Sequence, residues 1–254
     1  MTSTDDSATV DQRVCREYVS RDTPQGNPFR NLLPQAGTHP LLQITIVATS
    51  ASHMSHLLRL PLCRSGHDNG GSAASGSERG QRAYRHALAA KHKALGMMRN
   101  AVVNIHPDDC GAVLASVFFL VDLELMERGR ASWKAHLKGA GRILSLFQPT
   151  LASAGPLADY LSADYLIYAI MASVFMASPA FDTDSFFRPS PFSRTLKRAA
   201  AHSHICCPPD ILSVLLAAAT LSNTPGDSSD NEQIIAAAST LFESAHTFDV
   251  DAWA

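Results

Sequence analysis

One segment of this sequence carries apolar side chains on every side of the helix that it would form. The apolar residues of this segment are Val113, Leu114, Val117, Phe118, Phe119, Leu120, Val121, Leu123, Leu125 and Met126. A helix that is apolar around its whole circumference must be enclosed by protein or lipid. Asp122 and Glu124 interrupt the run, which is too short for a membrane-spanning helix. The segment therefore predicts a buried central helix that neighbouring helices surround.

A second, amphipathic helix follows the central one. The polar stretch 127–130 breaks the apolar pattern, which resumes at spacings of four, three, four and three with Trp133, Leu137, Ala140, Leu144 and Phe147. This spacing places one apolar face toward the central helix. The small residues Gly139 and Gly141 would permit close approach between helices, and Gln148-Pro149 predicts a break.

Helical spacing also recurs on both sides of this hairpin. The segment that opens at Pro40 keeps one apolar face for five turns, although its β-branched cluster 44–47 would also suit a strand. A long helix is predicted where apolar residues alternate at four and three, with Lys91 near the surface among them: Tyr84, Leu88, Leu95, Met98, Val102 and Ile105. Further helices are predicted over 156–177, 208–221 and 231–248. No strand is required, so we expect an all-α fold, an irregular multi-helix bundle with a buried central helix.

The chain divides into a short leader and one long helical region. Residues 1–26 are polar and aperiodic, and we expect a flexible leader there. Residues 27–254 form the helical region, in which the Gly- and Ser-rich stretch 63–80 reads as a flexible loop. This loop is too short and too central to separate two domains.

The charge balance and the cysteine usage exclude several classes of protein. Lys and Arg total 21 against 23 Asp and Glu, which leaves a formal charge of −2 and no basic stripe. A module that grips nucleic acid unaided usually has one. Five cysteines without framework spacing argue against a disulfide-stapled secreted domain, and no signal peptide is visible. We therefore expect a reduced, intracellular setting.

Three clusters contain residue types that bind metals. His202, His204 and Cys206, with Cys207 beside them, would converge in an extended segment and could bind zinc. His53 and His56 lie three apart on a predicted helix, whereas zinc-binding helices place two histidines four apart with a glutamate between. The third cluster is His106, Asp108, Asp109 and Cys110, where a helix-capping role for the aspartates is the simpler explanation.

No established catalytic motif is present in the sequence. GxSxG, GxxxxGK and GxGxxG elements are all missing. A nucleophilic Cys or Ser with a His base stays open on the sequence alone. The sequence therefore assigns no catalytic, cofactor-binding or metal-binding residue, and we expect a protein that is not an enzyme and has no cofactor in this chain. The alternative is a helical metal-dependent enzyme that uses His202, His204 and Cys206.

The residues that follow the central segment resemble a known family. The stretch 133–140, WKAHLKGA, with Ile143-Leu144, resembles the W..HL.GA..LL signature of the fungal-specific transcription factor domain, the helical regulatory region of fungal zinc binuclear cluster regulators. Similar elements occur in the family's order: NPFR at 27–30 through Leu33-Pro34, ASH at 51–53, CPPDIL at 207–212 and DAW at 251–253. The resemblance covers residue 27 to the end of the sequence.

The resemblance implies an all-α regulatory or dimerisation domain, incomplete at its C-terminus. It implies control of RNA polymerase II transcription in the nucleus through a homo- or heterodimer with related regulators, the transcription machinery or a small effector. The family's zinc cluster needs six spaced cysteines, which this chain lacks. We therefore expect no direct DNA binding by this chain and no membrane association, and a zinc cluster could be encoded upstream of Met1. We expect Trp133 to be a buried packing anchor and His136 to be hydrogen-bonded at a helix contact. The second alternative is a truncated paralogue that acts only by oligomerisation.

Overall fold

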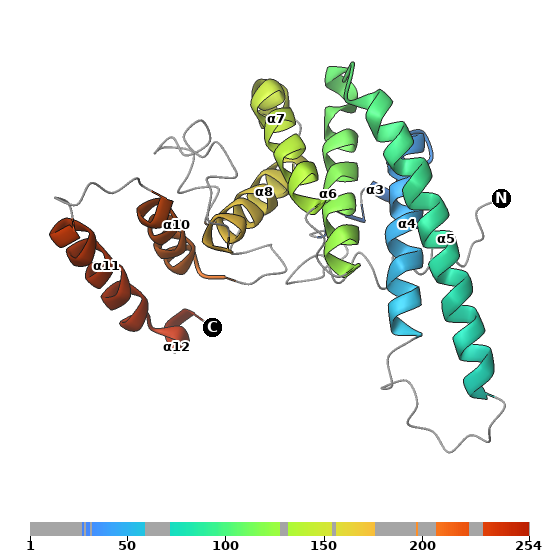
Figure 1. The fold of residues 1–254 in the computed structure, drawn as a ribbon. Helices are drawn as coiled ribbons and strands as arrows, with labels where there is room; N and C mark the ends of the chain where they lie inside the picture. The colour runs from blue at the N-terminus through green and yellow to red at the C-terminus, as the bar shows by residue number, and fades with distance from the viewer. Residues whose placement is uncertain are drawn as a thin grey trace.

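The computed structural model describes residues 27, 29–30, 32–58, 72–127, 132–153, 156–175, 197, 207–223 and 231–253. Every regular element in these ranges is a helix (Figure 1). The elements are α3 (Leu32–Ala36), α4 (Pro40–Leu57), α5 (Ser72–Ala101), the 3-10 turn η3 (Pro107–Asp109), α6 (Cys110–Met126), α7 (Ser132–Ser153), α8 (Pro156–Phe175), α10 (Pro209–Asn223), α11 (Asn231–His246) and α12 (Val250–Trp253). The all-α prediction is therefore confirmed. The predicted leader 1–26 lies outside the described residues.

The helix α6 is the buried centre that its sequence predicts. It lies between the α4–α5 pair and the α7–α8 pair, and it contacts helices of both pairs (Figure 1). Side chains on every side of it are buried, and Leu114, Leu120, Val121 and Leu123 are fully inaccessible to solvent. Neighbouring helices thus provide the enclosure that an all-round apolar helix requires. None of the helices in the described part of the chain has the length and hydropathy to cross a membrane.

The α4 helix packs against α5 mainly through small residues. The buried side of α5 is a row of alanines with one methionine, namely Ala87, Ala90, Ala94 and Met98. Small side chains allow two helix backbones to approach closely. The predicted apolar face of α5 is therefore wrong in part, because Leu88, Leu95 and Val102 are 41%, 37% and 48% exposed. The helix also ends at Ala101, before the predicted Ile105.

Four buried residues of α4 donate their hydroxyl groups to carbonyl oxygens of the same helix. Thr45 donates to the carbonyl oxygens of Leu41 and Leu42, and Ser50 donates to that of Ile46. Thr49 donates to the Thr45 carbonyl at 3.0 Å and also reaches the Phe119 carbonyl of α6 at 3.4 Å. These hydrogen bonds offset the free-energy cost of removing the hydroxyl groups from water. The helix prediction for this segment, with its β-branched cluster, is confirmed.

The predicted loop over 63–80 is wrong in its second half, because α5 begins at Ser72. The stretch SAASGSER contains four strong helix formers beyond its serines and glycine, and it continues without a break into the alanine-rich remainder of the helix. Local composition alone favoured a loop, whereas continuation of an established helix adds one hydrogen bond for each residue that is fixed. Residues 59–71 lie outside the described part.

The aromatic ring of Phe29 anchors the chain before α3. Asn27 is buried, and its side-chain oxygen accepts a hydrogen bond of 3.0 Å from the Phe29 backbone N–H. This turn directs the Phe29 ring edge-on to Phe119 of α6 and Tyr160 of α8, with centroid distances of 5.8 and 5.0 Å. Edge-to-face pairs of this kind add to the stability that burial gives. The NPFR element is thus part of the core.

The helix α7 packs closely on α8 and kinks where a break is predicted. A Cβ atom placed on Gly141 would lie 3.0 Å from Cζ of Tyr165, which is buried on α8. Glycine is therefore required at this helix crossing, as the sequence predicts for close approach. Phe147 has non-helical torsion angles, φ −110° and ψ 15°. The predicted break before Pro149 appears as this kink, since the helix continues to Ser153.

A smaller apolar group lies on the outer side of α8. It joins Ala163, Leu166, Ile167 and Ile170 to Leu212 of α10. Figure 1 shows α10, α11 and α12 beyond α8, on the side away from α4 and α5. The helix α11 has no buried residue, and Ile235 and Phe242 are 64% and 71% exposed. The predicted apolar face of α11 therefore remains largely uncovered in the described structure.

Candidate functional site

A pocket of about 570 Å³ opens between α5 and the corner where α6 gives way to α7. Its apolar wall consists of side chains from α5, namely Tyr84, Leu88 and Leu95. Its polar wall combines both sides of the corner: Lys91 and His92 of α5, Glu124 of α6, Glu127 just after α6, and Ser132 at the start of α7. The exposed leucines of α5 thus have a specific location, at the mouth of a polar pocket.

Lys91, Glu124 and Glu127 form an ion triad in the wall of this pocket. The Lys91 Nζ atom lies 2.8 Å from Oε1 of Glu124 and 2.5 Å from Oε2 of Glu127. The Ser132 hydroxyl donates to Oε2 of Glu124 at 2.6 Å. The side chains of Lys91 and Glu124 are only 14% and 7% exposed. Lys91 is therefore not the surface residue that its position in the sequence pattern predicts.

The ion pairs decide the protonation states of the triad. Burial acts to lower the pKa of Lys91, but the hydrogen bonds to Glu124 and Glu127 outweigh it and raise the pKa above that of an ordinary lysine. Burial acts to raise the pKa of Glu124, but the bonds from Lys91 and Ser132 outweigh it and lower the pKa. At neutral pH Lys91 is therefore an ammonium and Glu124 a carboxylate.

His136 lies one helical turn after Ser132, close to the same charges. Burial lowers its pKa; Glu124 acts to raise it and Lys91 to lower it further. The imidazole is therefore neutral at physiological pH. The predicted hydrogen bond of His136 at a helix contact is not among the hydrogen bonds of the described residues. Trp133 is half buried at the edge of the core rather than fully buried, so its predicted role as an anchor is met only in part.

The chemistry of this pocket suits binding rather than catalysis. A lysine with a raised pKa remains protonated and has no free electron pair for nucleophilic attack. A glutamate with a lowered pKa is a weak general base at neutral pH. The Ser132 hydroxyl donates to Glu124, which is not free to act as its base because it is also paired with Lys91.

The predicted zinc-type cluster cannot be placed. His202, His204 and Cys206 lie outside the described residues. Cys207 is a half-buried free thiol that packs against the group on the outer side of α8, and burial raises its pKa. His53 and His56 are half buried on α4. Within the described ranges, no three His, Cys, Asp or Glu side chains are arranged to hold a metal ion.

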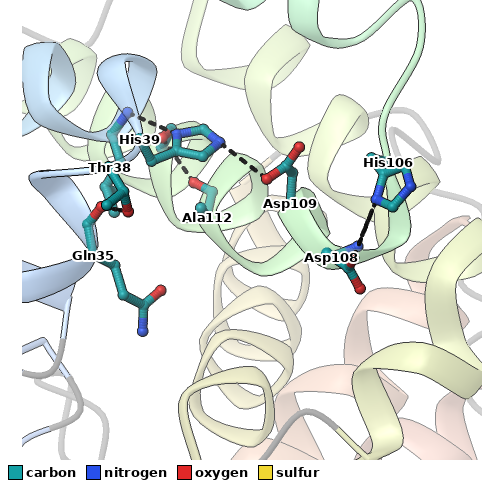
Figure 2. A network of polar contacts seen from close by, with 9 residues as sticks. Gln35, Thr38, His39, His106, Asp108, Asp109 and Ala112 are labelled. Carbon is teal, nitrogen blue, oxygen red and sulfur yellow. Dashed lines mark hydrogen bonds and ion pairs between the residues drawn. The ribbon is translucent and has the colours of Figure 1, made fainter.

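The cluster before α6 has a capping role, but the residues that perform it differ from the prediction. Figure 2 shows His106 directed at the backbone of Asp108, whose N–H donates to Nδ1 of His106 at 3.4 Å. Asp109 occupies the N-cap position of α6 without a side-chain capping bond. Its carboxylate instead lies 3.9 Å from Nε2 of His39 (Figure 2). The predicted capping by the aspartates is therefore wrong, and two histidines act as caps.

His39 performs the same task for α4. Its Nδ1 accepts from the Leu42 N–H at 3.3 Å, while Nε2 faces Asp109. The imidazole thus connects the start of α4 with the start of α6 (Figure 2). Cys110, the first residue of α6, is buried, and burial raises the pKa of its thiol. These residues organise helix ends, and the ligand set predicted there as an option does not form.

Sequence reasoning missed the triad, although one signal was available. Glu124 lies inside a helix that is apolar on all sides, and a charged residue in such a position requires a partner. The partner lies on another helix, 33 positions earlier in the chain. Local spacing cannot identify a partner at that separation, so the site becomes visible only in the folded structure.

The chain is similar to known proteins over most of its length. The model of a family described as "Fungal specific transcription factor domain" matches residues 12–250. A curated relative, acriflavine sensitivity control protein acr-2 of Neurospora crassa, is 32% identical over 250 residues, which cover 94% of this chain and 40% of the relative. The chain thus spans less than half the length of that relative. No solved structure matches the chain.

Proposed function

The chain belongs to the fungal specific transcription factor domain family, and from this premise we propose that it is the regulatory part of a fungal transcription regulator acting in the nucleus. The observation that carries the proposal is the family match, which extends over residues 12–250. The family is a class of transcription factor domains rather than of enzymes. The enclosed helical core supports a role as a scaffold for regulatory contacts.

A reporter fusion tests this role. The full chain is joined to a heterologous DNA-binding module, and transcription from a promoter with that module's site is measured in a fungal host. We expect the fusion to raise or lower transcription relative to the module alone. A matched fusion with Leu120→Asp, which places a charge in the fully buried centre of α6, should lose the effect. A well-expressed, folded wild-type fusion without any effect would refute the regulatory role.

Contact with a second protein is the mode of action that we propose first. The support is the apolar face of α11, where Ile235 and Phe242 are mostly exposed. Seven residues apart, the two side chains lie on the same face of the helix, two turns from each other, and exposed apolar side chains that share a face can mark an interaction surface. We propose that the partner is a second copy of this chain or a related regulator.

Sedimentation velocity of the purified chain tests this association. The wild-type chain should sediment as a dimer at micromolar concentration. The double substitution Ile235→Ser, Phe242→Ser should shift it to a monomer, because it removes apolar area from an already exposed face. Glu243→Ala, on the same helix and also exposed, is the matched control and should leave the dimer unchanged. A monomeric wild-type chain that also fails to associate with related regulators contradicts the proposal.

The name of the relative indicates a biological output that can be tested. That protein is named for the control of acriflavine sensitivity. We extend this output to the product of the gene that encodes this chain. Deletion of the encoding gene should change the concentration of acriflavine that halves growth, and reintroduction of the gene should restore it. An unchanged concentration would exclude this output without affecting the transcriptional test.

A further inference from the structure

We propose that α11 of one copy of this chain packs antiparallel on α5 of a second copy. The inference rests on the proposed association between copies and deepens it, because it names the surface that receives the apolar face of α11. Both helices expose apolar side chains at the same spacing, their exposed charges have opposite signs, and the two faces lie too far apart to meet within one molecule.

The exposed apolar side chains of the two helices have the same spacing. Leu88 and Leu95 of α5 are exposed, and Val102, just after the helix, continues their row at the same interval of seven. Ile235 and Phe242 of α11 are also exposed and also lie seven residues apart. An interval of seven returns to the same helix face after two turns. Two rows with this interval can therefore interdigitate along their length when the helices pack side by side.

The charges beside the leucine row of α5 are basic. Arg85 lies three residues before Leu88, and Arg99 lies four residues after Leu95, so both arginines share the face of that row. Both are exposed, and neither has an ion-pair partner in the described part of the chain. Glu78 is the only acidic residue in the sequence of α5.

The neighbouring charges do not reverse the sign of this face. The carboxylates of Glu124 and Glu127 pair with Lys91, which lies on the opposite side of the leucine row from the two arginines. The stretches between α4 and α5 and between α6 and α7 whose placement is not described, 59–71 and 128–131, contain four arginines and one aspartate. Their composition therefore adds to the positive charge in this part of the chain.

The charges beside the apolar row of α11 are acidic. Glu232 and Glu243 are exposed, and their separation of eleven residues, three turns, places them along one edge of that row. The sequence from 231 to 253 contains no lysine or arginine, and the preceding stretch 224–230 adds two aspartates. Packing of α11 on α11, or of α5 on α5, would bring like charges together. The unlike pair brings opposite charges together and is therefore favoured.

The charged edges also determine the direction of packing. Each edge lies on the same rotational side of its apolar row, so the two edges face each other only when the helices run antiparallel. The equal spacing then matches both rows at once, Leu88 with Phe242 and Leu95 with Ile235. This register also places two ion pairs along the edge, Arg85 with Glu243 and Arg99 with Glu232.

A second copy is required because the two faces lie at opposite ends of the molecule. Figure 1 shows α5 at one end of the row of helices and α11 at the other, with α6, α7 and α8 between them. One molecule therefore cannot cover its own α5 with its own α11. Two copies related by a twofold axis can make the contact twice, which closes a dimer.

Charge reversal on one helix at a time tests the contact. The α5 variant is Arg85→Glu, Arg99→Glu, and the α11 variant is Glu232→Arg, Glu243→Arg. Each variant turns the attractive pairs of both contacts into repulsive ones, so each should raise the Kd of the dimer at least about tenfold in sedimentation velocity of the full chain. Neutralisation of a single exposed acid, as in Glu243→Ala, removes only one weak pair and changes little.

An equimolar mixture of the two variants tests whether the contact forms between copies. In a mixed dimer, the acidic α5 of one copy meets the basic α11 of the other, and the two unchanged helices meet in the second contact. The mixture should therefore regain the wild-type Kd. Lys138→Glu, Arg142→Glu, exposed on α7, changes the net charge as much as the α5 variant does and should leave the dimer unchanged. Thermal unfolding of each variant establishes that it is folded.

The outcomes separate a failure of this contact from a failure of the proposed association. A wild-type dimer that depends on Ile235 and Phe242 but not on Arg85 and Arg99 overturns this inference and leaves the association. A mixture that stays monomeric also overturns it, as expected if a segment of the same chain, such as 1–26 with its five acidic residues against three arginines, covers α5. A monomeric wild-type chain overturns it as well, and the proposed association then stands only if the chain binds a related regulator.

Discussion

At the residue scale, Lys91 is the cation that makes the burial of Glu124 possible. Glu124 is 7% exposed and has Lys91 and Ser132 as its polar partners among the described residues. Charges in such positions are stable only when they are paired. The pairing joins α5 to α6, two helices that otherwise share few contacts. The triad therefore fixes the position of α5 over the corner as well as the charge of the pocket.

Removal of that cation should be strongly destabilising. We predict that Lys91→Met lowers the free energy of unfolding by about 3 kcal/mol, because it leaves the buried Glu124 carboxylate without its counter-ion. The double variant Lys91→Met, Glu124→Met should recover part of this loss, since an apolar pair of similar volume can replace an ion pair. Urea unfolding of the two variants and of the single Glu124→Met variant completes a double-mutant cycle. Additive losses would show that the two residues are not coupled.

The same residues give the protein an acid-sensitive stability. The pKa of Glu124 is lower in the folded chain than in the unfolded chain. Glu124 therefore stabilises the fold at pH values above its pKa in the unfolded chain, and this stabilisation is lost as the pH falls through its pKa in the folded chain. Burial also lowers the pKa of His136 from 6.5, so the unfolded chain binds that proton first and stability rises with pH between the two values. The pKa of Lys91 is raised, so the contribution of Lys91 to the free energy of unfolding persists until the pH exceeds the pKa of an ordinary lysine.

We therefore predict that the free energy of unfolding falls as the pH is lowered from about 7 to about 4. His136→Gln should remove the part of this fall that lies just below about pH 6.5 and leave the more acidic part, which belongs to Glu124. Urea denaturation at a series of pH values measures both curves. Identical slopes for the wild type and the variant near pH 6 would show that His136 does not contribute.

At the scale of the element, α5 shows how far helical spacing predicts a fold. Its spacing predicts a helix, which is confirmed, but a helix rich in alanine has two faces that qualify as apolar. The leucine face with Leu88 and Leu95 has the larger side chains, yet the alanine face is the one that α4 covers. Close approach to the small residues of α4 selects alanine, and this selection depends on a partner that local sequence does not contain.

The alanine face should therefore tolerate no increase in size. We predict that Ala94→Leu lowers the free energy of unfolding by about 2 kcal/mol, because Ala94 is fully buried where α5 meets its neighbours. Ala89→Leu adds the same atoms to an exposed position of the same helix and should change stability by less than about 0.5 kcal/mol. Thermal unfolding of both variants compares them. Equal effects would show that the alanine face is not closely packed.

Two glycines of α7 allow a second pair of matched substitutions, one at the contact with α8 and one away from it. We predict that Gly141→Ala destabilises by about 2 kcal/mol, because its methyl group would overlap the ring of Tyr165, which is enclosed on α8. Gly139 has no neighbour within 4 Å of an added Cβ atom. Gly139→Ala should therefore stabilise by about 0.5 kcal/mol through helix propensity. Urea unfolding decides, and a stabilising Gly141→Ala would refute the close crossing of α7 and α8.

At the scale of the whole molecule, the sequence predicts the buried central helix α6 better than the polar sites around it. The central helix is recognisable because its entire circumference is apolar, and that property needs no knowledge of partners. The sites at the margins depend on pairs such as Lys91 and Glu124, or His39 and Asp109, that are far apart in the chain. The class of fold therefore follows from the sequence, whereas the location of the candidate pocket requires the three-dimensional arrangement.

The two apolar groups also predict two levels of stability. The large group surrounds α6, whereas the small one joins α10 to the outer side of α8 through Leu212. The described part of α11 contacts α10 but buries no residue. Elements with so little buried area open more readily than the core. Local opening of α10 and α11 should therefore occur without unfolding of α4 to α8.

Hydrogen exchange of backbone amides can measure these two levels separately. Leu212→Ala removes a fully buried side chain from the small group, a change that costs about 2–5 kcal/mol where the site does not collapse. We predict that it accelerates exchange in α10 and α11 and leaves the slowest amides of α6 unchanged. Leu120→Ala, which is equally buried in the large group, should accelerate those slowest amides because they exchange only through global unfolding. If Leu212→Ala accelerates α6 to the same extent as Leu120→Ala, the two groups unfold together and a separately opening C-terminal part is excluded.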